Sequence, residues 1–337
     1  MKTILITGGA GYIGSHTIVE LVNNGFDVVV VDNLSNSKFE VIKRVENITN
    51  KPIKFYKEDI LDKEKLRQIF MENKIDACIH FAGFKAVGES CKKPLMYYHN
   101  NITGTLCLLE VMKEFNCKNL IFSSSATVYG SPATVPITED FPLSTTNPYG
   151  TTKLFIERIL EDVYTANPDF NIGILRYFNP IGASKTGLIG EDPNGIPNNL
   201  CPYITKVLFG KLEKLSIFGN DYPTHDGTGV RDYIHVEDLA MGHRLALNKL
   251  FENSGLYKVN LGTGKGYSVL DIVKAFEKVS GKKIPYQITE RRSGDIATCY
   301  ADTTKAKEFL GFEAQNDLED MVRDAIRFQE KNPNGIE

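Results

Sequence analysis

Residues 2–14, with the sequence KTILITGGAGYIG, decide the predicted fold of this chain. Residues 2–7 form a short apolar run that is typical of a buried strand, and Gly8, Gly11 and Gly14 follow at once. Glycine suits such a turn because the backbone must bend tightly and approach a phosphate closely, while the following helix packs near the strand. Glycines are also common in turns that bind no ligand, so the cluster by itself is consistent with a phosphate-binding turn and with a purely structural one.

Outward from this turn, short apolar runs alternate with stretches of helical period as far as about residue 180. This alternation predicts an α/β protein with a Rossmann-type doubly wound parallel sheet. The expected strands are 2–7, 27–32, 53–56, 76–81, 119–124 and 171–177. The expected helices are 12–24, 63–73, 94–115 and 149–166, the last with Asn147 as N-cap and Pro148 at its first position.

The regular pattern ends near residue 180, which predicts a second region. Glycines and prolines between residues 182 and 197 predict a long loop, and residues 234–236 and 257–261 resemble further strands. We therefore expect a dinucleotide-binding domain over residues 1–180, joined by parts of 232–262. Residues 181–337 are expected to form mainly a smaller α/β substrate-binding domain.

The composition excludes several classes of protein. The chain has 337 residues, of which 39 are Lys or Arg and 42 are Asp or Glu, so its net charge of -3 gives no field that would hold nucleic acid or an anionic membrane. The apolar runs are too short for a membrane span or a signal peptide. The six cysteines include no C-x-x-C pair, which argues against a zinc site or a disulfide framework and favours a reducing cytoplasm.

A carboxylate follows the second expected strand. Asp32 stands 18 residues after Gly14, where it can accept the ribose hydroxyls of an adenosine, and no cation follows before Lys38 to bind a 2′-phosphate. This spacing favours NAD over NADP. Asp59 and the FAG segment at 81–83 also follow expected strands, at the sheet edge where ligands bind in open α/β sheets.

A tyrosine and a lysine share one face of the helix expected at 149–166. Tyr149 is the only one of 15 tyrosines with a lysine, Lys153, four residues later, although chance alone predicts about one such pair in this composition. The serines at 123–125 end an expected strand and would be unusual as buried packing. A nearby ammonium and a bound nicotinamide cation should lower the pKa of Tyr149, which would make this phenol a general base.

Longer motifs carry a closer resemblance. The segments HFAG at 80–83, KAVGES at 85–90, SSSATVYG at 123–130, RYFNP at 176–180, GIPNNL at 195–200 and GVRDYIHV at 229–236 join the glycine turn and the Tyr149 pair. In these motifs, which run essentially from end to end, the chain resembles the UDP-glucose 4-epimerase family, in the extended branch of the short-chain dehydrogenases/reductases.

The resemblance implies a reaction and three catalytic residues. Tyr149 would take the proton from the sugar 4-hydroxyl while C4 passes hydride to NAD, which gives a 4-keto sugar and enzyme-bound NADH. Ser125 would bridge the sugar and the phenol, and Lys153 would hold the nicotinamide ribose. Return of hydride to the other face of the ketone interconverts UDP-galactose and UDP-glucose, an isomerase reaction of galactose metabolism.

The resemblance also implies the binding sites, in which Arg231 and Arg292 face the diphosphate as forked donors. The NAD site would comprise Gly8, Gly11, Tyr12, Ile13, Gly14, Asp32, Asn33, Leu34, Ser35, Asn36, Ser37, Asp59, Ile60, Phe81, Ala82, Gly83, Lys85, Asn100, Ser125, Tyr149, Lys153, Tyr177 and Phe178. The UDP-sugar site would comprise Lys85, Ser125, Tyr149, Asn179, Asn199, Leu200, Ser216, Ile217, Phe218, Arg231, Arg292, Asp295 and Cys299. No metal is implied.

Cys299 departs from the family's pattern, because many bacterial members carry tyrosine there. A smaller side chain would leave room beside the sugar 2-position, so we expect the N-acetylated UDP-sugars to be substrates as well. The alternative is that Cys299 is a buried small hydrophobe. The family resemblance further implies a homodimer formed through the helices expected at 94–115 and 149–166.

Rival functions remain at this point. Sugar-nucleotide 4,6-dehydratases carry acids after the serine position, whereas Ala126 and Thr127 stand there in this chain, which disfavours dehydration. A nucleotide-sugar dehydrogenase or decarboxylase is a second rival. The third is a catalytically silent NAD-sensing protein, and retention of the Tyr149 and Lys153 pair argues against it.

Overall fold

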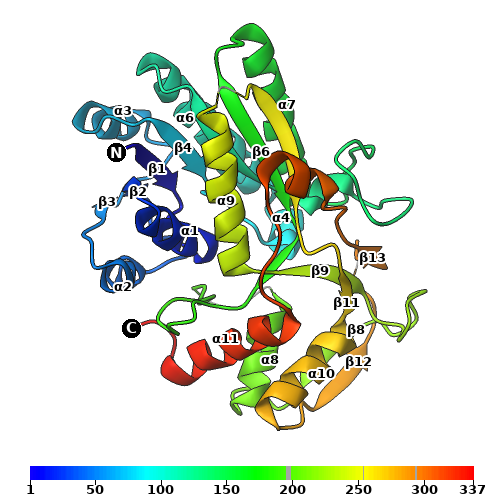
Figure 1. Cartoon of the computed structure of the whole chain (residues 1–337). Helices are drawn as coiled ribbons and strands as arrows, with labels where there is room; N and C mark the ends of the chain where they lie inside the picture. The colour runs from blue at the N-terminus through cyan, green and yellow to red at the C-terminus, as the bar shows by residue number, and fades with distance from the viewer. Residues whose placement is uncertain (195–198, 253, 293) are drawn as a thin grey trace.

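The computed structural model describes residues 1–194, 199–252, 254–292 and 294–337, and a seven-stranded parallel sheet forms its centre (Figure 1). The strands follow the order β10 (Leu256–Leu261), β6 (Asn171–Tyr177), β5 (Asn119–Ser125), β4 (Ala77–His80), β1 (Thr3–Thr7), β2 (Asp27–Val31) and β3 (Lys54–Tyr56). Each neighbouring pair is parallel. The predicted Rossmann-type α/β fold is therefore confirmed.

Both faces of this sheet are covered, and residue alternation along the strands decides which side chain enters which layer. Ile4 and Ile6 of β1 pack into one buried cluster, whereas Leu5 between them packs into the other. Successive side chains of a strand point to opposite faces, so a strand that is buried on both sides is mostly apolar. This explains why the apolar runs are continuous rather than alternating.

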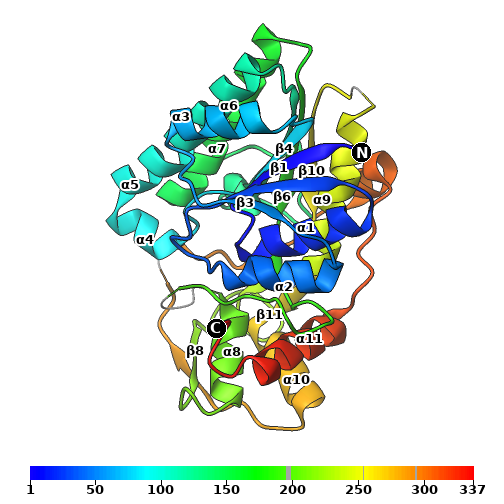
Figure 2. The same ribbon diagram turned by 90° about the vertical axis from the view of Figure 1, so that its left-hand side faces the viewer.

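Helices cover the two faces (Figure 2). On one face lie α1 (Tyr12–Asn23), α2 (Glu40–Thr49) and α9 (Val236–Leu250), and on the other lie α3 (Lys63–Glu72), α6 (Gly104–Glu114) and α7 (Pro148–Ala166). The predicted start of α7 is confirmed, because the Asn147 side chain accepts from Gly150 N–H and Pro148 occupies the first turn.

One helical prediction was wrong in detail, and several helices were missed. The helix expected at 94–115 is divided into α5 (Pro94–Tyr98), a π-helical turn η1 (His99–Thr103) and α6. A π turn adds one residue per turn without ending the helix, so the apolar spacing on either side does not reveal it. Helices α2 and α4 (Val87–Lys92) were not predicted, nor was any helix after residue 166.

The smaller part of the molecule lies below the large sheet in Figure 1. It contains strands β7 (Asn179–Ile181), β9 (Val230–His235), β11 (Gly266–Ser268) and β13 (Thr298–Cys299), and the pair β8 (Leu215–Phe218) and β12 (Tyr286–Thr289). Its helices are α8 (Leu200–Leu208), α10 (Val269–Ser280) and α11 (Leu318–Lys331). Two further turns, η2 (Ala126–Tyr129) and η3 (Ala306–Leu310), complete the described elements.

The chain crosses between the two parts more than once. The strand expected at 234–236 is wrong in its limits: β9 begins at Val230 and ends at His235, belongs to the small sheet, and leads directly into α9. The next strand, β10, returns to the large sheet beside β6. Residues 182–194 form no helix or strand, as expected for a loop, and residues 195–198 of the GIPNNL motif lie outside the described residues.

Within the described ranges, no helix combines the length and the apolar character that crossing a membrane requires.

Candidate functional site

A cavity of about 760 Å³ lies at the carboxyl ends of β1, β2, β4 and β6, because residues that end or directly follow these strands line it. Strands β1 and β4 are neighbours, and the chain continues from β1 to β2 on one side but from β4 to β5 on the other, so the connections after these two strands diverge. Such a switch point leaves a crevice between the diverging loops, and it is where open α/β sheets bind ligands. The sequence predicted this edge of the sheet as the site.

The glycine turn after β1 packs closely against the segment that follows β4. Gly8 has a φ of +70°, and a Cβ there would lie 2.8 Å from the backbone nitrogen of Ala82. A Cβ on Gly14 would lie 2.5 Å from the Gly8 carbonyl oxygen. Helix α1 begins after Gly11 without a side-chain cap, and its first residues line the cavity. Its N-terminal N–H groups are therefore available to an anion in the cavity.

A buried histidine that was not singled out supports the adjacent loop. His80 ends β4, and its ring nitrogens lie 2.6 Å from Thr7 Oγ1 and 2.9 Å from Thr105 Oγ1. Burial lowers the His80 pKa to about 3, so the ring is neutral at ordinary pH. The same Thr7 hydroxyl accepts from Ala82 N–H, which fixes the segment after β4 against β1.

Asp32 organises the loop at one end of the cavity. Its carboxylate accepts from Ala10 N–H at 3.1 Å, from Leu34 N–H at 2.8 Å and from Ser37 Oγ at 3.0 Å. Burial raises the Asp32 pKa, and these three hydrogen bonds oppose that rise. A carboxylate has about four acceptor positions, so it retains capacity for a further donor from the cavity.

Tyr149 and Lys153 line the opposite end of the cavity from one face of α7, as their spacing predicted. Lys153 Nζ donates to the Ser123 carbonyl oxygen at 2.7 Å and lies 4.8 Å from the centre of the Phe122 ring. Burial lowers the Lys153 pKa to about 8, although the charge of Glu157 raises it. The ammonium group is therefore held on the backbone of β5, beside Tyr149.

Tyr149 is buried, and burial decides the direction of its pKa shift. Burial raises the pKa of its phenol, the charge of Tyr177 raises it further, and a hydrogen bond with Ser125 lowers it. Lys153 is not among the groups that shift this pKa. Desolvation dominates the pKa of the phenol at this buried position, so the lowering expected from the ammonium and a bound nicotinamide cation together stays a prediction.

The three serines at 123–125 divide into two kinds, which corrects the expectation that their hydroxyls would be unusual as packing. Ser123 Oγ lies 3.2 Å from Nε2 of His243, and Ser124 Oγ donates to Glu157 at 2.5 Å, both in the interior. Only Ser125, at the end of β5, is directed to Tyr149. Alternation along the strand places the first two hydroxyls against the helices on opposite faces.

Most residues predicted for the cofactor line this one cavity. They are Gly8, Gly11, Tyr12, Ile13, Gly14, Asp32, Asn33, Ser35, Asn36, Ser37, Ile60, Phe81, Ala82, Gly83, Lys85, Asn100, Tyr149, Lys153 and Tyr177. Leu34, Asp59, Ser125 and Phe178 do not line it: Asp59 accepts from Asn33 Nδ2 at 2.8 Å, and Phe178 is buried in a cluster with Cys299. The sequence missed the opposite wall, which consists of Gly190, Glu191, Asp192, Pro193, Asn194 and Ile336.

Glu191 connects this wall to two predicted substrate residues. Its side chain, which is 8% exposed, accepts from Lys85 Nζ at 3.3 Å and from Asn199 Nδ2. Lys85 comes from the segment after β4, whereas Asn199 precedes α8, so the carboxylate brings the two parts of the molecule together. No local motif marks Glu191, because its partner Lys85 lies 106 residues away along the chain.

The predicted phosphate-binding arginines lie in the smaller part, outside the cavity described above. Arg292 pairs with Asp295 through its Nε at 2.9 Å, and its guanidinium carbon lies 4.9 Å from the centre of the exposed Phe218 ring. Arg231 Nη1 donates to the Val230 carbonyl oxygen at 2.8 Å. Burial raises the pKa of Tyr233 to about 12 and both arginines oppose the rise, so the two charges share one neighbourhood.

The remaining predicted substrate residues have different surroundings. Ser216 accepts from Gln287, whereas Ile217, the next residue of β8, is buried in the core of the smaller part. Asn179 is exposed at the start of β7, and Leu200 begins α8 and packs against the same core.

Cys299 lies opposite Arg231 in the pairing of β13 with β9. It is 7% exposed and packs with Val128, Tyr129 and Phe178, and burial raises the pKa of its thiol to about 11. The side chain is thus a small buried group next to one of the predicted diphosphate contacts.

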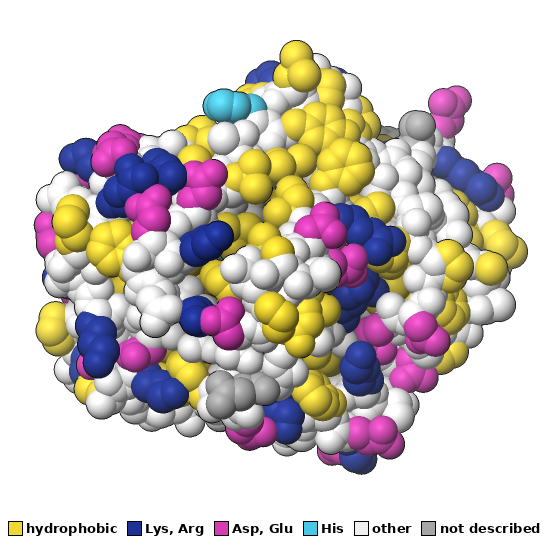
Figure 3. Space-filling view, turned by 90° about the horizontal axis from the view of Figure 1, so that it is seen from above, with side chains coloured by type: hydrophobic (Ala, Val, Ile, Leu, Met, Phe, Trp, Pro, Cys, Tyr) yellow, Lys and Arg dark blue, Asp and Glu magenta, His cyan; other side chains and the backbone are white. Residues whose placement is uncertain are grey.

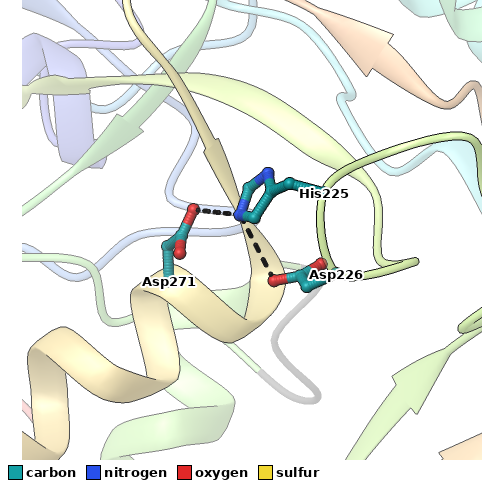
Figure 4. A group of neighbouring side chains, drawn as sticks. All are labelled: His225, Asp226 and Asp271. Carbon is teal, nitrogen blue, oxygen red and sulfur yellow. Dashed lines mark ion pairs between the residues drawn. The ribbon is translucent and has the colours of Figure 1, made fainter.

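A separate polar cluster closes the loop between β8 and β9 onto α10 (Figure 4). His225 Nε2 lies 3.5 Å from Asp226 and 3.1 Å from Asp271. Both carboxylates already have structural partners: Asp226 accepts from Thr228 and Ser268, and Asp271 accepts from the Ser268 N–H in the capping box of α10. We interpret the cluster as a loop-to-helix contact.

Comparisons with known proteins agree with this geometry. The family described as "GDP-mannose 4,6 dehydratase" matches residues 5–325. A UDP-glucose 4-epimerase of Bacillus subtilis (strain 168) is 62% identical over 332 residues, which cover 98% of each chain.

Solved structures agree as well. UDP-glucose 4-epimerase of Bifidobacterium longum in complex with NAD+ and UDP has a TM-score of 0.96 at 55% identity, covering 99% of this chain and 100% of that one. The enzyme of Stenotrophomonas maltophila with bound NAD and formylated UDP-arabinopyranose has a TM-score of 0.97 at 47% identity, covering 99% of each. The chain therefore belongs to the UDP-glucose 4-epimerase family of extended short-chain dehydrogenases/reductases.

Proposed function

We propose that this chain interconverts UDP-galactose and UDP-glucose by inverting C4 of the sugar, with NAD as its resident cofactor. One observation carries the proposal: Tyr149 and Lys153 line one end of a cavity whose other end contains Asp32 and whose middle faces the uncapped N-terminus of α1. The names and ligands of the similar proteins above support the same assignment.

The residues present fit NAD. Asp32 retains acceptor capacity for the adenosine ribose, the N–H groups at the start of α1 suit a pyrophosphate, and the close approach at Gly8 and Gly14 keeps side chains out of that path. Lys153, held on Ser123, would meet the nicotinamide ribose. When bound, NAD would take hydride from C4 of the sugar and return it.

Tyr149 is the group we propose to move the proton of the 4-hydroxyl, with Ser125 as the hydroxyl between phenol and sugar. The influence of the Ser125 hydroxyl, which lowers the pKa of the phenol, supports this arrangement. Burial is the largest of the effects that raise the pKa of Tyr149. The phenol therefore needs positive charge in the cavity before it can act as a base near neutral pH. The Lys153 ammonium and the cationic nicotinamide together would supply it.

Residues of the smaller part would hold the UDP-sugar. We propose that Arg231 and Arg292 bind the diphosphate, that Phe218 packs against the uracil, and that Asp295 accepts from the uridine ribose. The neighbourhood shared by Arg231, Arg292 and Phe218 supports this proposal. On this division, residues 1–180 with parts of 232–262 bind NAD, and residues 181–337 bind mainly the sugar nucleotide.

We also propose that the N-acetylated UDP-sugars are substrates. The support is the small volume of Cys299, which lies opposite Arg231 and close to the proposed diphosphate contacts. Its burial in a packed cluster is equally the surrounding expected of a plain structural residue, so the substrate test described in the Discussion decides between the two roles.

A homodimer is proposed from the outer surface of α5, α6 and α7. Leu95 is 82% exposed and Phe155 is 48% exposed there, and Leu106 lies nearby on α6. Figure 3 shows hydrophobic side chains gathered at the top of that view. An apolar patch of this kind is typical of a protein interface. The cytoplasmic location expected from the cysteine spacing stays a proposal.

The experiment that tests the function gives the purified protein UDP-galactose without added NAD. We expect UDP-glucose to accumulate to equilibrium and NAD to be released when the protein is denatured. Absence of conversion, together with absence of released NAD, would overturn the proposal. Accumulation of free NADH would instead support the dehydrogenase alternative.

A further inference from the structure

The wall missed by the sequence encloses the adenosine end of the cavity. Ser35 and Ser37, from the loop after β2, line one side there, and Asp192, Asn194 and Ile336 line the other. These groups come from segments that are far apart along the chain. The contact between them therefore depends on tertiary structure alone.

One carboxylate joins the three segments. Lys38 Nζ donates to Asp192 Oδ2 at 2.9 Å and to the Ile336 carbonyl oxygen at 2.8 Å, and Ile336 N–H donates to the same Oδ2 at 2.7 Å. We call Lys38, Asp192 and Ile336 the Asp192 cluster. Beside it, Asn194 Nδ2 donates to the Ser37 carbonyl oxygen at 3.4 Å.

Packing around Ile336 also restricts its contact with Asp192. The Ile336 side chain is 1% exposed and belongs to the core cluster that includes Val41 and Ile189. A Cβ on Gly335, whose φ is +90°, would lie 2.8 Å from the carboxylate oxygens of Asp192. The segment that carries Ile336 thus approaches Asp192 closely and has little freedom to shift.

We infer that the Asp192 cluster holds residues 190–194 across the adenosine end of the cofactor cavity and slows the release of bound NAD. The inference rests on the proposed function, since it presumes that NAD is the ligand. It adds cofactor-retaining residues that the sequence did not identify. It also gives Lys38 a role other than binding a 2′-phosphate, because its ammonium already donates to two oxygens.

The expected effect is moderate. The side chains of Lys38 and Asp192 are 36% and 23% exposed, and partly exposed ion pairs contribute little on their own. Here one carboxylate oxygen accepts from both an ammonium and a backbone N–H, so its loss weakens two contacts at once. We expect NAD release to accelerate about three- to tenfold.

The experiment measures NAD release from the purified holoprotein. Protein carrying NAD is diluted into excess ADP-ribose as a competitor, and the NAD still bound is separated and quantified over time. The variants are Asp192→Asn, which keeps an acceptor but removes the charge, and Lys38→Met. The matched control is Lys43→Met. Lys43 is close to Lys38 in the sequence, but its ammonium pairs with Glu40 within α2.

Faster release from both variants, with Lys43→Met within about twofold of the parent, is the expected result. The double variant should release NAD no faster than the quicker single variant, because both changes remove the same contact. Unchanged release from Asp192→Asn and Lys38→Met, at unchanged melting temperature, would overturn the inference. Parent protein that holds no NAD at all would instead overturn the proposed function.

Discussion

The catalytic end of the large sheet and the charged surface of the smaller part differ in how completely their polar groups are satisfied from within. Lys153 donates to the Ser123 carbonyl oxygen, and both Lys153 and Tyr149 are more than nine-tenths buried. Arg292, in contrast, is half exposed and pairs with Asp295, three residues away. The first region is preformed, whereas Arg292 would have to exchange its ion pair with Asp295 for the proposed diphosphate.

This difference suggests separate tasks. A fixed, dry environment makes electrostatic effects strong and suits proton transfer, because nothing has to reorganise at the moment of reaction. A half-exposed arginine can release one partner and take another at little cost, which suits a site that binds and releases a nucleotide at each turnover. Changes in the first region should therefore lower kcat, and changes in the second should mainly raise KM.

The largest effect is expected from Tyr149→Phe. Removal of the hydroxyl deletes the proposed proton carrier but keeps the ring that packs at the start of α7, so we expect kcat to fall about 10²- to 10⁴-fold. NAD content and melting temperature should stay close to those of the parent. A variant that keeps more than about a tenth of the parental kcat would show that the region is not catalytic in the proposed way.

The second effect is expected from Arg292→Met. Loss of charge-assisted hydrogen bonds to a diphosphate should raise KM about 10- to 100-fold while kcat changes little. Arg291→Met is the matched control, because Arg291 precedes it directly but pairs with Asp221 and lies over Tyr222. Equal KM values for the two variants would contradict the proposed division of tasks.

The third effect concerns Cys299 and substrate choice. Cys299→Tyr should fill the space beside the sugar 2-position and lower the turnover of UDP-N-acetylgalactosamine relative to UDP-galactose by about tenfold, the scale of roughly 1–3 kcal/mol for a mismatch in pocket shape. Cys299→Ala should leave the ratio nearly unchanged. If the ratio is the same in parent and Cys299→Tyr, Cys299 does not select the sugar.

The smallest effect is a pH dependence of stability. The folded-state pKa of Lys153 is lowered to about 8, below its ordinary value near 10.4. Between these values the unfolded chain binds a proton that the folded chain does not, so the contribution of Lys153 to stability rises with pH in this window and is constant below it.

Melting of the parent and of Lys153→Met between pH 7 and 10 checks this sign. The parent should gain stability relative to the variant as the pH rises above 8. Lys92→Met, at an exposed position, serves as the control and should follow the parent throughout. A parent that loses stability relative to Lys153→Met over this range would contradict the assignment of Lys153 as a buried, desolvated ammonium group.

Local signals explain what the sequence could predict. The strand and glycine turn of residues 2–14, the spacing to Asp32, and the Tyr149 and Lys153 pair on one helix face depend only on nearby residues. They identified the fold and most of one cavity wall. Glu191, Asp192 and Ile336 carry no such signal, because their partners lie up to 298 residues away.

The same reasoning explains the errors. The π turn His99–Thr103 preserves the apolar spacing around it, and the depth of Ser123 and Ser124 follows from helices that pack on them from elsewhere in the chain. The pKa of Tyr149 depends on desolvation, which spacing along a helix cannot reveal.

The most direct test of the account follows the hydrogen at C4. UDP-galactose deuterated at C4 is incubated with the purified protein without added NAD, and the product is analysed by NMR. We predict UDP-glucose that keeps the deuterium at C4, because the atom removed from one face returns to the other. Deuterium found at C6 of a 4-keto-6-deoxy sugar, or lost to water, would contradict C4 epimerisation as the function of this protein.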